Sequence, residues 1–229
     1  MKEKRRKLGV PKAHVSATYR KVQVTVPDAP VDVNIPARMT FYVDTRFTAA
    51  QVSRIQVLAG LVLLNWDTHF TELNDGAARS RYQQCVNKYA KFNLAPVWFE
   101  GKLTNGAAAA AVQMDGFTTQ IAANGFGQAA KAYIMYQKSG SSTIKGVNAS
   151  NPETNSLTVT INATDISKTS VTNQFLAGSL QHAWLHREGY RHPAGKYTNY
   201  FAGECSMCLM RNNKDKTSTP ASTYTQWLD

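Results

Sequence analysis

Three of the five histidines in the chain stand close together, at His182, His186 and His192. At about 3.6 residues per turn, His182 and His186 lie one above the other on the same face of a helix, so both imidazoles can reach one metal ion. Gly189 can take a left-handed conformation that ends the helix and turns the chain, which allows His192 to reach the same ion. Three neutral imidazoles with an open fourth position are typical of a catalytic zinc site. The alternative is a histidine-rich surface helix without a metal.

The spacing of these histidines resembles the motif H-E-x-x-H-x-x-G-x-x-H of the metzincin metallopeptidases, with Gly189 as the glycine of the motif. Pro193, directly after the third histidine, is similar to the residue that serralysin-type members carry there. The resemblance implies Zn²⁺ as the cofactor and a peptide or protein as the substrate. It also implies a methionine-containing turn beneath the zinc, with Met207 as the first candidate and Met210 as the substitute.

One residue departs from the motif at the position that carries the chemistry, because Ala183 stands where the family has its glutamate. That glutamate takes a proton from the zinc-bound water, a contribution typically worth about 10²–10⁴-fold in rate. Glu188 does not replace it, because at ~100° per residue it is rotated to the far side of the helix from His182. The sequence therefore favours a zinc endopeptidase inactivated by a change of glutamate to alanine. The alternative is a natural pseudopeptidase that binds zinc and peptides without turnover.

The segments that must position these residues predict an α+β fold. Residues 48–66 combine a helix capping box with apolar side chains at helical period, and apolar residues from 171 to 185 lead into the histidines at the same period. By resemblance, residues 38–189 form an upper subdomain with a twisted mixed sheet and two long helices. Residues 190–229 then form a short irregular lower subdomain, and the zinc lies in the cleft between the two.

Residues 157–164 alternate apolar and polar side chains, which is typical of a strand with one buried and one solvated face. We expect an edge strand here. By resemblance it forms the rim of the cleft, where an extended peptide adds itself as another strand. The substrate-binding side chains would then be Leu157, Val159 and Ile161.

Other segments are predicted from local pattern alone. Three further strands are expected, at residues 22–26, 39–43 and 95–100. A helix with a weaker sequence pattern is expected at residues 79–92, and the alanine run 107–111 fits a loop or a helix. His69, just beyond the first helix, is expected as a surface or helix-end histidine.

The charge of the chain is concentrated at its start. Residues 1–21 hold eight basic residues and one acidic residue, so they carry +7 of the formal net charge of +11. We interpret residues 1–37 as a basic arm and linker before a catalytic domain at residues 38–229. A solvated arm is favoured over a nucleic-acid site, and no nucleic-acid partner is expected.

Targeting signals are not evident in the sequence. No apolar run approaches the ~20 residues of a membrane-spanning helix, and the basic start is not followed by an apolar stretch of about 7–15 residues. We therefore expect no membrane span and no signal peptide. The chain is expected to be cytoplasmic as written, or secreted with its leader removed, and its oligomeric state is left open.

The cysteines give a weak signal. Three cysteines, Cys85, Cys205 and Cys208, cannot all pair within one chain, so a disulfide framework is not expected. Cys205 and Cys208 have the spacing C-x-x-C, for which a small local disulfide or two buried thiols are favoured over a redox or zinc role.

Overall fold

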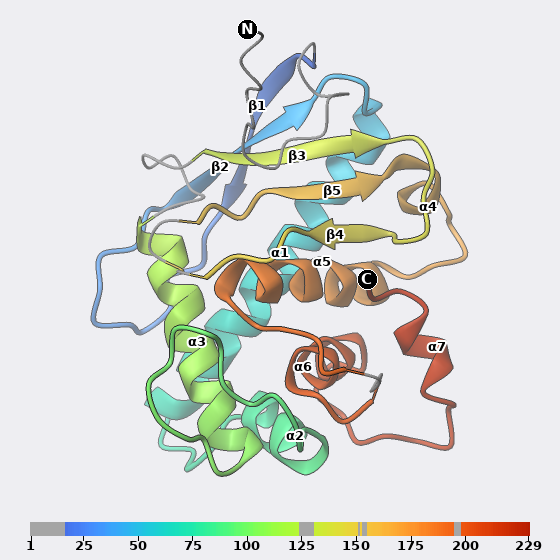
Figure 1. Ribbon diagram of the computed structural model, residues 1–229. Coiled ribbons are helices and arrows are strands. Elements are labelled where there is room, and N and C mark those ends of the chain that lie inside the picture. Colours follow the sequence, from blue (N-terminus) through green and yellow to red (C-terminus); the bar gives the residue numbers. More distant parts are fainter. Residues whose placement is uncertain (1–16, 124–130, 151, 153–154, 195–197) are drawn as a thin grey trace, which may run out of the picture.

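The computed structural model describes residues 17–123, 131–150, 152, 155–194 and 198–229 of the chain. One five-stranded mixed sheet forms one layer, and the long helices gather on one side of it (Figure 1). The predicted α+β class is confirmed. Residues 1–16, which hold most of the basic arm, lie outside the described residues.

The sheet has a parallel centre with an antiparallel strand at each edge. Its strands are β1 (Tyr19–Thr25), β2 (Arg38–Asp44), β3 (Ala132–Gln137), β4 (Ile144–Gly146) and β5 (Val159–Asn162). They lie in the order β1-β2-β3-β5-β4. Strand β2 is parallel to β3 and β3 is parallel to β5, whereas β1 and β4 run antiparallel to their neighbours.

The prediction that residues 157–164 form the edge strand is wrong. The strand exists as β5, but it lies between β3 and β4 and pairs with both. The edge position belongs to the short strand β4. Alternation of apolar and polar residues reports one buried and one solvated face, and an interior strand of a sheet covered on one side has both. The pattern therefore cannot distinguish an interior strand from an edge strand.

The sheet begins before the boundary that the sequence suggested at residue 38. Strand β1 pairs with β2 along its whole length, from Tyr19 opposite Asp44 to Thr25 opposite Arg38. Val22 and Val24 face the core, as their alternation with polar residues predicts. Residues 19–25 are therefore part of the sheet, and not of a separate arm.

The helices are α1 (Ala49–Asn74), α2 (Arg81–Tyr89), α3 (Gly106–Ala123), α4 (Ala163–Ile166), α5 (Asn173–Glu188), α6 (Phe201–Met210) and α7 (Ser222–Thr225). The capping box that starts α1 is confirmed, because the Thr48 side chain accepts from Gln51 N and the Gln51 side chain accepts from Thr48 N. Within the described part of the chain, no helix is long and apolar enough to cross a membrane.

Helix α5 is held against the sheet by aromatic packing. The Trp184 ring stacks on Phe41 of β2 at a centroid distance of 5.9 Å, and its indole Nε1 donates to the Leu157 carbonyl oxygen at 3.1 Å. Trp184 and Phe41 are both buried. Burying an aromatic pair of this size stabilises the fold by a few kcal/mol, which fixes the position of α5 beneath the sheet.

Several local predictions are corrected by tertiary packing. The alanine run 107–111 lies in α3, whereas residues 95–100 form no strand and residues 79–92 contain the shorter helix α2.

His69 lies within α1, and only 2% of it is exposed. Its Nδ1 atom lies 2.7 Å from the hydroxyl of Ser80, which caps the start of α2. His69 is therefore a buried residue between α1 and α2, and not a surface histidine.

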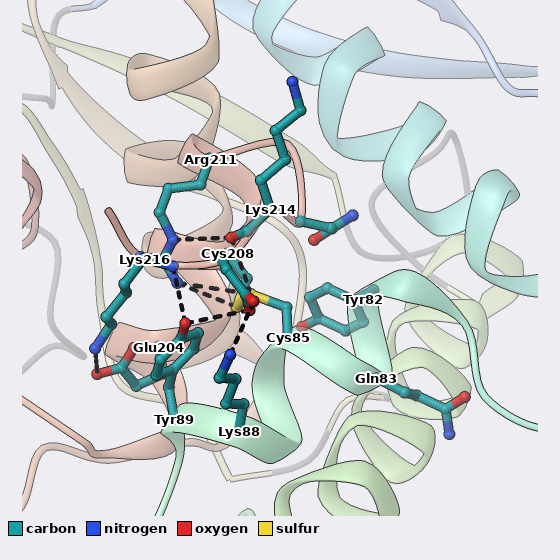
Figure 2. Close-up of a disulfide and its surroundings, with 12 residues drawn as sticks. Tyr82, Gln83, Cys85, Lys88, Tyr89, Glu204, Cys208, Arg211, Lys214 and Lys216 are labelled. Atoms are coloured by element: carbon teal, nitrogen blue, oxygen red, sulfur yellow. Dashed lines mark hydrogen bonds and ion pairs between the residues drawn. A yellow bond between two sulfur atoms is a disulfide. The ribbon is translucent and has the colours of Figure 1, made fainter. Parts of the chain in front are cut away.

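A disulfide between Cys85 of α2 and Cys208 of α6 corrects the expectation from the sequence. The two residues are 123 positions apart, so no local spacing indicates the pair. Figure 2 shows the Arg211 side chain beside the two sulfur atoms, to each of which its Nη2 donates at 3.6 Å. Cys205, the other member of the C-x-x-C, is a buried free thiol.

Residues 190–229 are less irregular than the resemblance implied. They contain α6 and α7, and α6 packs directly on α5. A Cβ atom on Gly178 of α5 would meet the Ser206 carbonyl oxygen at 2.8 Å, so a glycine is needed where the two helices approach. Helix α6 therefore packs against the face of α5 that carries Gly178 and His182.

Candidate metal centre

Helix α5 has defined ends, and these ends position the first two histidines. The Thr172 side chain accepts from Phe175 N at the start. At the other end Gly189 takes a left-handed conformation with φ of 112°, and Tyr190 N donates to the Leu185 carbonyl oxygen at 3.0 Å. The sequence prediction of a helix that ends at Gly189 is confirmed. His186 therefore stands in the last turn of α5, directly before the chain turns back.

The three predicted histidines come together. The Nε2 atoms of His182 and His186 are 3.2 Å apart, and Nε2 of His192 lies 3.2 Å from that of His182 and 2.9 Å from that of His186. His182 and His186 are buried, whereas His192 is exposed. The turn after Gly189 thus brings the third imidazole to the first two, and solvent reaches the group from the side of His192.

The hydrogen bonds of the other ring nitrogens fix the direction of the lone pairs. Nδ1 of His186 lies 3.0 Å from the Tyr190 carbonyl oxygen, and Nδ1 of His182 lies 3.3 Å from the Ala202 carbonyl oxygen. A carbonyl oxygen only accepts, so each Nδ1 carries the proton, and in the neutral ring Nε2 is left with a lone pair. This arrangement is the usual one for histidines that bind a metal ion.

A fourth residue joins the histidines, and the sequence analysis missed it. Oδ1 of Asp229 lies 3.3 Å from Nε2 of His182 and 3.3 Å from Nε2 of His186. The Asp229 side chain is 8% exposed, and its Oδ1 has no hydrogen-bond partner among the described residues. The prediction of an open fourth position is therefore wrong for this structure, because a carboxylate oxygen lies there.

Four donor atoms within 4.8 Å of one another can hold a metal ion. The group consists of His182, His186, His192 and Asp229. Lone pairs of two buried imidazoles and a buried carboxylate that face one another are destabilising unless a cation lies among them. The donor set therefore fits a metal ion on electrostatic grounds as well as by distance.

The pKa values of these residues favour the states that bind metals. Burial and the neighbouring imidazoles lower the pKa of His182 to about 3, and burial lowers that of His192. Burial alone would raise the pKa of Asp229, but the imidazoles of His186 and His182 lower it below its ordinary value. Near neutral pH, His182 and His192 are therefore neutral and Asp229 is ionised, as ligation requires.

Residue 183, where the metzincin motif has its general base, is not accessible to solvent. Ala183 is completely buried, and its carbonyl oxygen lies where a Cβ atom on Gly146 of β4 would be. Glu188 is buried on the far side of α5, where its carboxyl accepts from Gln113 Nε2 at 3.2 Å. Burial raises the pKa of Glu188 well above its ordinary value, and its carboxyl is directed toward Gln113 of α3, away from the histidines. Its exclusion as a base on sequence grounds agrees with this position.

The methionine turn implied by the resemblance is not formed. Residues 201–210 are the helix α6, and Met207 lies in a small cluster with Met210 and Tyr224. Two polar atoms of α6 lie next to the His182 ring, the Ala202 carbonyl oxygen and the Ser206 hydroxyl, each 3.3 Å from Nδ1. Helix α6 supports the histidines through these polar atoms.

The residues predicted to bind substrate have a different role. Leu157, Val159 and Ile161 are completely or almost completely buried. Their segment holds α5 in place through the bond from Trp184 Nε1 to the Leu157 carbonyl oxygen. A residue that the sequence analysis missed, Tyr200, lies beside the histidines, with its ring centroid 5.1 Å from that of His192.

Comparison of the chain with models of known protein families, with curated proteins and with solved structures found no match. The conclusions on function therefore depend on the residues of the metal centre.

Proposed function

We propose that this chain is a zinc-binding protein with a site of the metallopeptidase type, which holds the metal without hydrolysing peptides. The observation that carries the proposal is the convergence of three imidazole nitrogens and one carboxylate oxygen, with the Nδ1 atoms of His182 and His186 directed at backbone carbonyl oxygens. The helical spacing of His182 and His186 and the turn at Gly189 account for this geometry.

The donor set supports zinc over other common metals. Three imidazoles and one carboxylate suit Zn²⁺, whereas calcium and magnesium prefer six or more oxygen ligands. A tetrahedral zinc ion with bonds of ~2.0–2.1 Å keeps its ligand atoms about 3.3 Å apart. The separations of 2.9–3.2 Å between imidazole nitrogens, and of 3.3 Å from Asp229 to His182 and to His186, are close to this value. The four donor atoms together lie within 4.8 Å of one another.

Two features of the site oppose hydrolysis. A bound zinc ion would supply a water molecule of lowered pKa and would polarise a carbonyl group, but this chemistry needs an open coordination position and a general base. Asp229 occupies the fourth position, and Ala183 offers no proton acceptor. In this arrangement the four residues would hold the metal ion, and the burial of His182 and His186 would shield one side of it from water.

A second candidate is a zinc endopeptidase that this chain represents in inactive form. The intact set of histidines around a single alanine favours it, because only the base at position 183 and access to the metal are missing. Peptide binding along the outer edge of β4, the last strand of the sheet, would belong to this function.

Metal analysis of the purified protein tests the main proposal. We expect about one zinc ion per chain in the protein as given and almost none in a His186→Ala variant. A folded protein that retains no zinc, or a His186→Ala variant with unchanged zinc content, would overturn the assignment.

A peptidase assay separates the two candidates. The Ala183→Glu variant and the double variant Ala183→Glu with Asp229→Ala are incubated with unfolded protein and peptide mixtures, and cleavage is read by mass spectrometry. Cleavage that chelators abolish, absent from the unchanged chain, would favour the endopeptidase. Folded, zinc-loaded variants that cleave nothing would favour the binding protein.

A further inference from the structure

Asp229 lies in a segment, residues 217–229, whose hydrogen bonds are mostly internal to the segment. Apart from the contacts of Asp229 with the histidines, the hydrogen bonds of residues 217–229 in the described part of the chain have their partners inside the same segment. Its helix α7, for example, is held by bonds such as Thr225 N to the Ala221 carbonyl oxygen at 3.0 Å. Among the described residues, the backbone of this segment therefore forms no ladder with the sheet, and its polar contact with α5 is the one made by Asp229.

Apolar contacts hold this segment instead. Tyr224 stacks on Phe175 of α5 at a centroid distance of 5.3 Å, with the two rings 5° from parallel. Tyr224 also packs with Met207 and Met210 of α6 in a cluster separate from the main core. Partly buried Trp227 and Leu228 pack on that cluster, and Trp227 also contacts the main core. A small apolar cluster without anchoring hydrogen bonds opens at a lower free energy than the core of a domain.

The contact that the segment makes with the histidines is polar. Oδ1 of Asp229 is buried, lacks a hydrogen-bond partner among the described residues and faces Nε2 of His182 and Nε2 of His186. This carboxylate oxygen is close enough to two of the histidines to serve as a further ligand of an ion that they hold. The other three ligands come from α5 and from the turn that follows it, so Asp229 is the one ligand carried by a different element, which packs on α5 and α6 mainly through apolar side chains.

We propose that residues 222–229 form an internal plug for the metal centre, in which Asp229 is a displaceable fourth ligand. The inference rests on the proposed function, since it requires that the histidines bind a metal ion. With the plug in place, the ion has four protein ligands and no exchangeable position. When the segment leaves, the ion keeps three histidines and gains a position for water or for an external carboxylate or other small anion.

Cobalt substitution tests the plug without relying on catalysis. Co²⁺ replaces zinc in such sites, and its visible spectrum responds to a change of ligand. Titrations with azide and with acetate are compared for the unchanged protein, Asp229→Asn, Tyr224→Ala and Asp215→Asn. Asp215→Asn is the matched control, because it removes an exposed carboxylate outside residues 222–229 that pairs with Lys88. Circular dichroism establishes that each variant is folded.

We expect the cobalt spectra of the unchanged protein and of Asp229→Asn to differ. Azide and acetate should alter the spectra of Asp229→Asn and Tyr224→Ala at concentrations at least about tenfold below those needed for the unchanged protein and for Asp215→Asn. Tyr224→Ala is informative because it loosens the segment and leaves all four ligands in place. Metal affinity should fall about 10- to 100-fold in Asp229→Asn.

The outcomes distinguish this inference from the proposed function. A folded, unchanged protein that binds neither zinc nor cobalt overturns both. If one cobalt ion binds through the histidines but the unchanged protein and Asp229→Asn respond equally to azide, the plug is overturned and the metal site stands. If Asp229→Asn responds and a folded Tyr224→Ala does not, Asp229 is a ligand but the segment does not act as a movable plug.

Discussion

The Nδ1 atom of His186 lies 3.0 Å from the carbonyl oxygen of Tyr190, on the turn that ends helix α5. The turn therefore has two effects on the metal centre. It brings His192 back to the other histidines, and it supplies the acceptor that directs the Nε2 lone pair of His186 toward them. The geometry of the site depends on Gly189, whose positive φ makes the turn possible.

Replacement of Gly189 by alanine should weaken both the fold and the metal site. A Cβ atom there would lie 2.9 Å from Cδ1 of Trp98, in addition to the strain of a left-handed alanine. Gly76→Ala is the matched control, since Gly76 also has a positive φ but nothing within 4 Å of the added Cβ. We expect Gly76→Ala to lower the free energy of unfolding by about 1–2 kcal/mol and Gly189→Ala by more.

The same pair of variants separates stability from metal binding. Zinc titration should show a roughly 10- to 100-fold weaker affinity in Gly189→Ala and an unchanged affinity in Gly76→Ala. Equal zinc affinities in the two folded variants would argue against the role of the turn in orienting His186.

Removal of the Cys85–Cys208 disulfide should destabilise the protein without removing the metal ligands. The bond closes a loop across 123 positions, so its loss should cost about 2–5 kcal/mol of unfolding free energy. Denaturation by urea with and without a dithiol reductant measures the effect. The reductant should destabilise the Cys205→Ser variant as it does the unchanged protein. It should have no effect on a variant in which Cys85 and Cys208 are both serine, and an effect there would count against the disulfide.

The buried histidine at position 69 should make the fold sensitive to acid. Burial lowers its pKa to about 4, compared with about 6.5 in an unfolded chain. The unfolded state therefore binds a proton at higher pH than the folded state, so stability is lost as pH falls from about 6.5 to 4. At pH 4.5 the loss from this residue alone is about 2–3 kcal/mol.

This pH effect is measurable apart from the metal. Urea denaturation at pH 7 and pH 4.5, in the presence of a chelator, gives the change in unfolding free energy for the unchanged protein and for His69→Asn. The asparagine variant should lose less stability between the two pH values. An identical loss in both proteins would exclude His69 as a source of the acid sensitivity.

The sequence predicted the parts of the site that local geometry controls. His182, His186 and the turn at Gly189 follow from helical period and from the conformational freedom of glycine, and the structure confirms that His192 joins them. Asp229 could not be predicted in this way. It is far from His192 in sequence and reaches the site only because α7 packs on α5 and α6. The only indication of such a residue in the sequence was that a metal ion held by three histidines needs a fourth ligand.

The secondary structure was predictable for elements that have one solvent-exposed face and one buried face. Helix α1 has such a pattern and a capping box, whereas α3 is buried around much of its circumference, at Ala109, Ala110 and Thr118 among others. The spacing of apolar residues therefore does not identify α3 as a helix. The order of strands in the sheet, like the pairing of Cys85 with Cys208, is a long-range property that no local pattern encodes.

X-ray absorption at the zinc edge tests the central claim most directly, because it reports the atoms bound to the metal. For the purified protein with one equivalent of zinc, we predict four nitrogen or oxygen ligands at ~2.0–2.1 Å, with the outer-shell scattering of three imidazoles. The His186→Ala variant should lose one imidazole or bind no zinc. Sulfur ligands at ~2.3 Å, or a spectrum that His186→Ala leaves unchanged, would contradict a metal centre at His182, His186, His192 and Asp229.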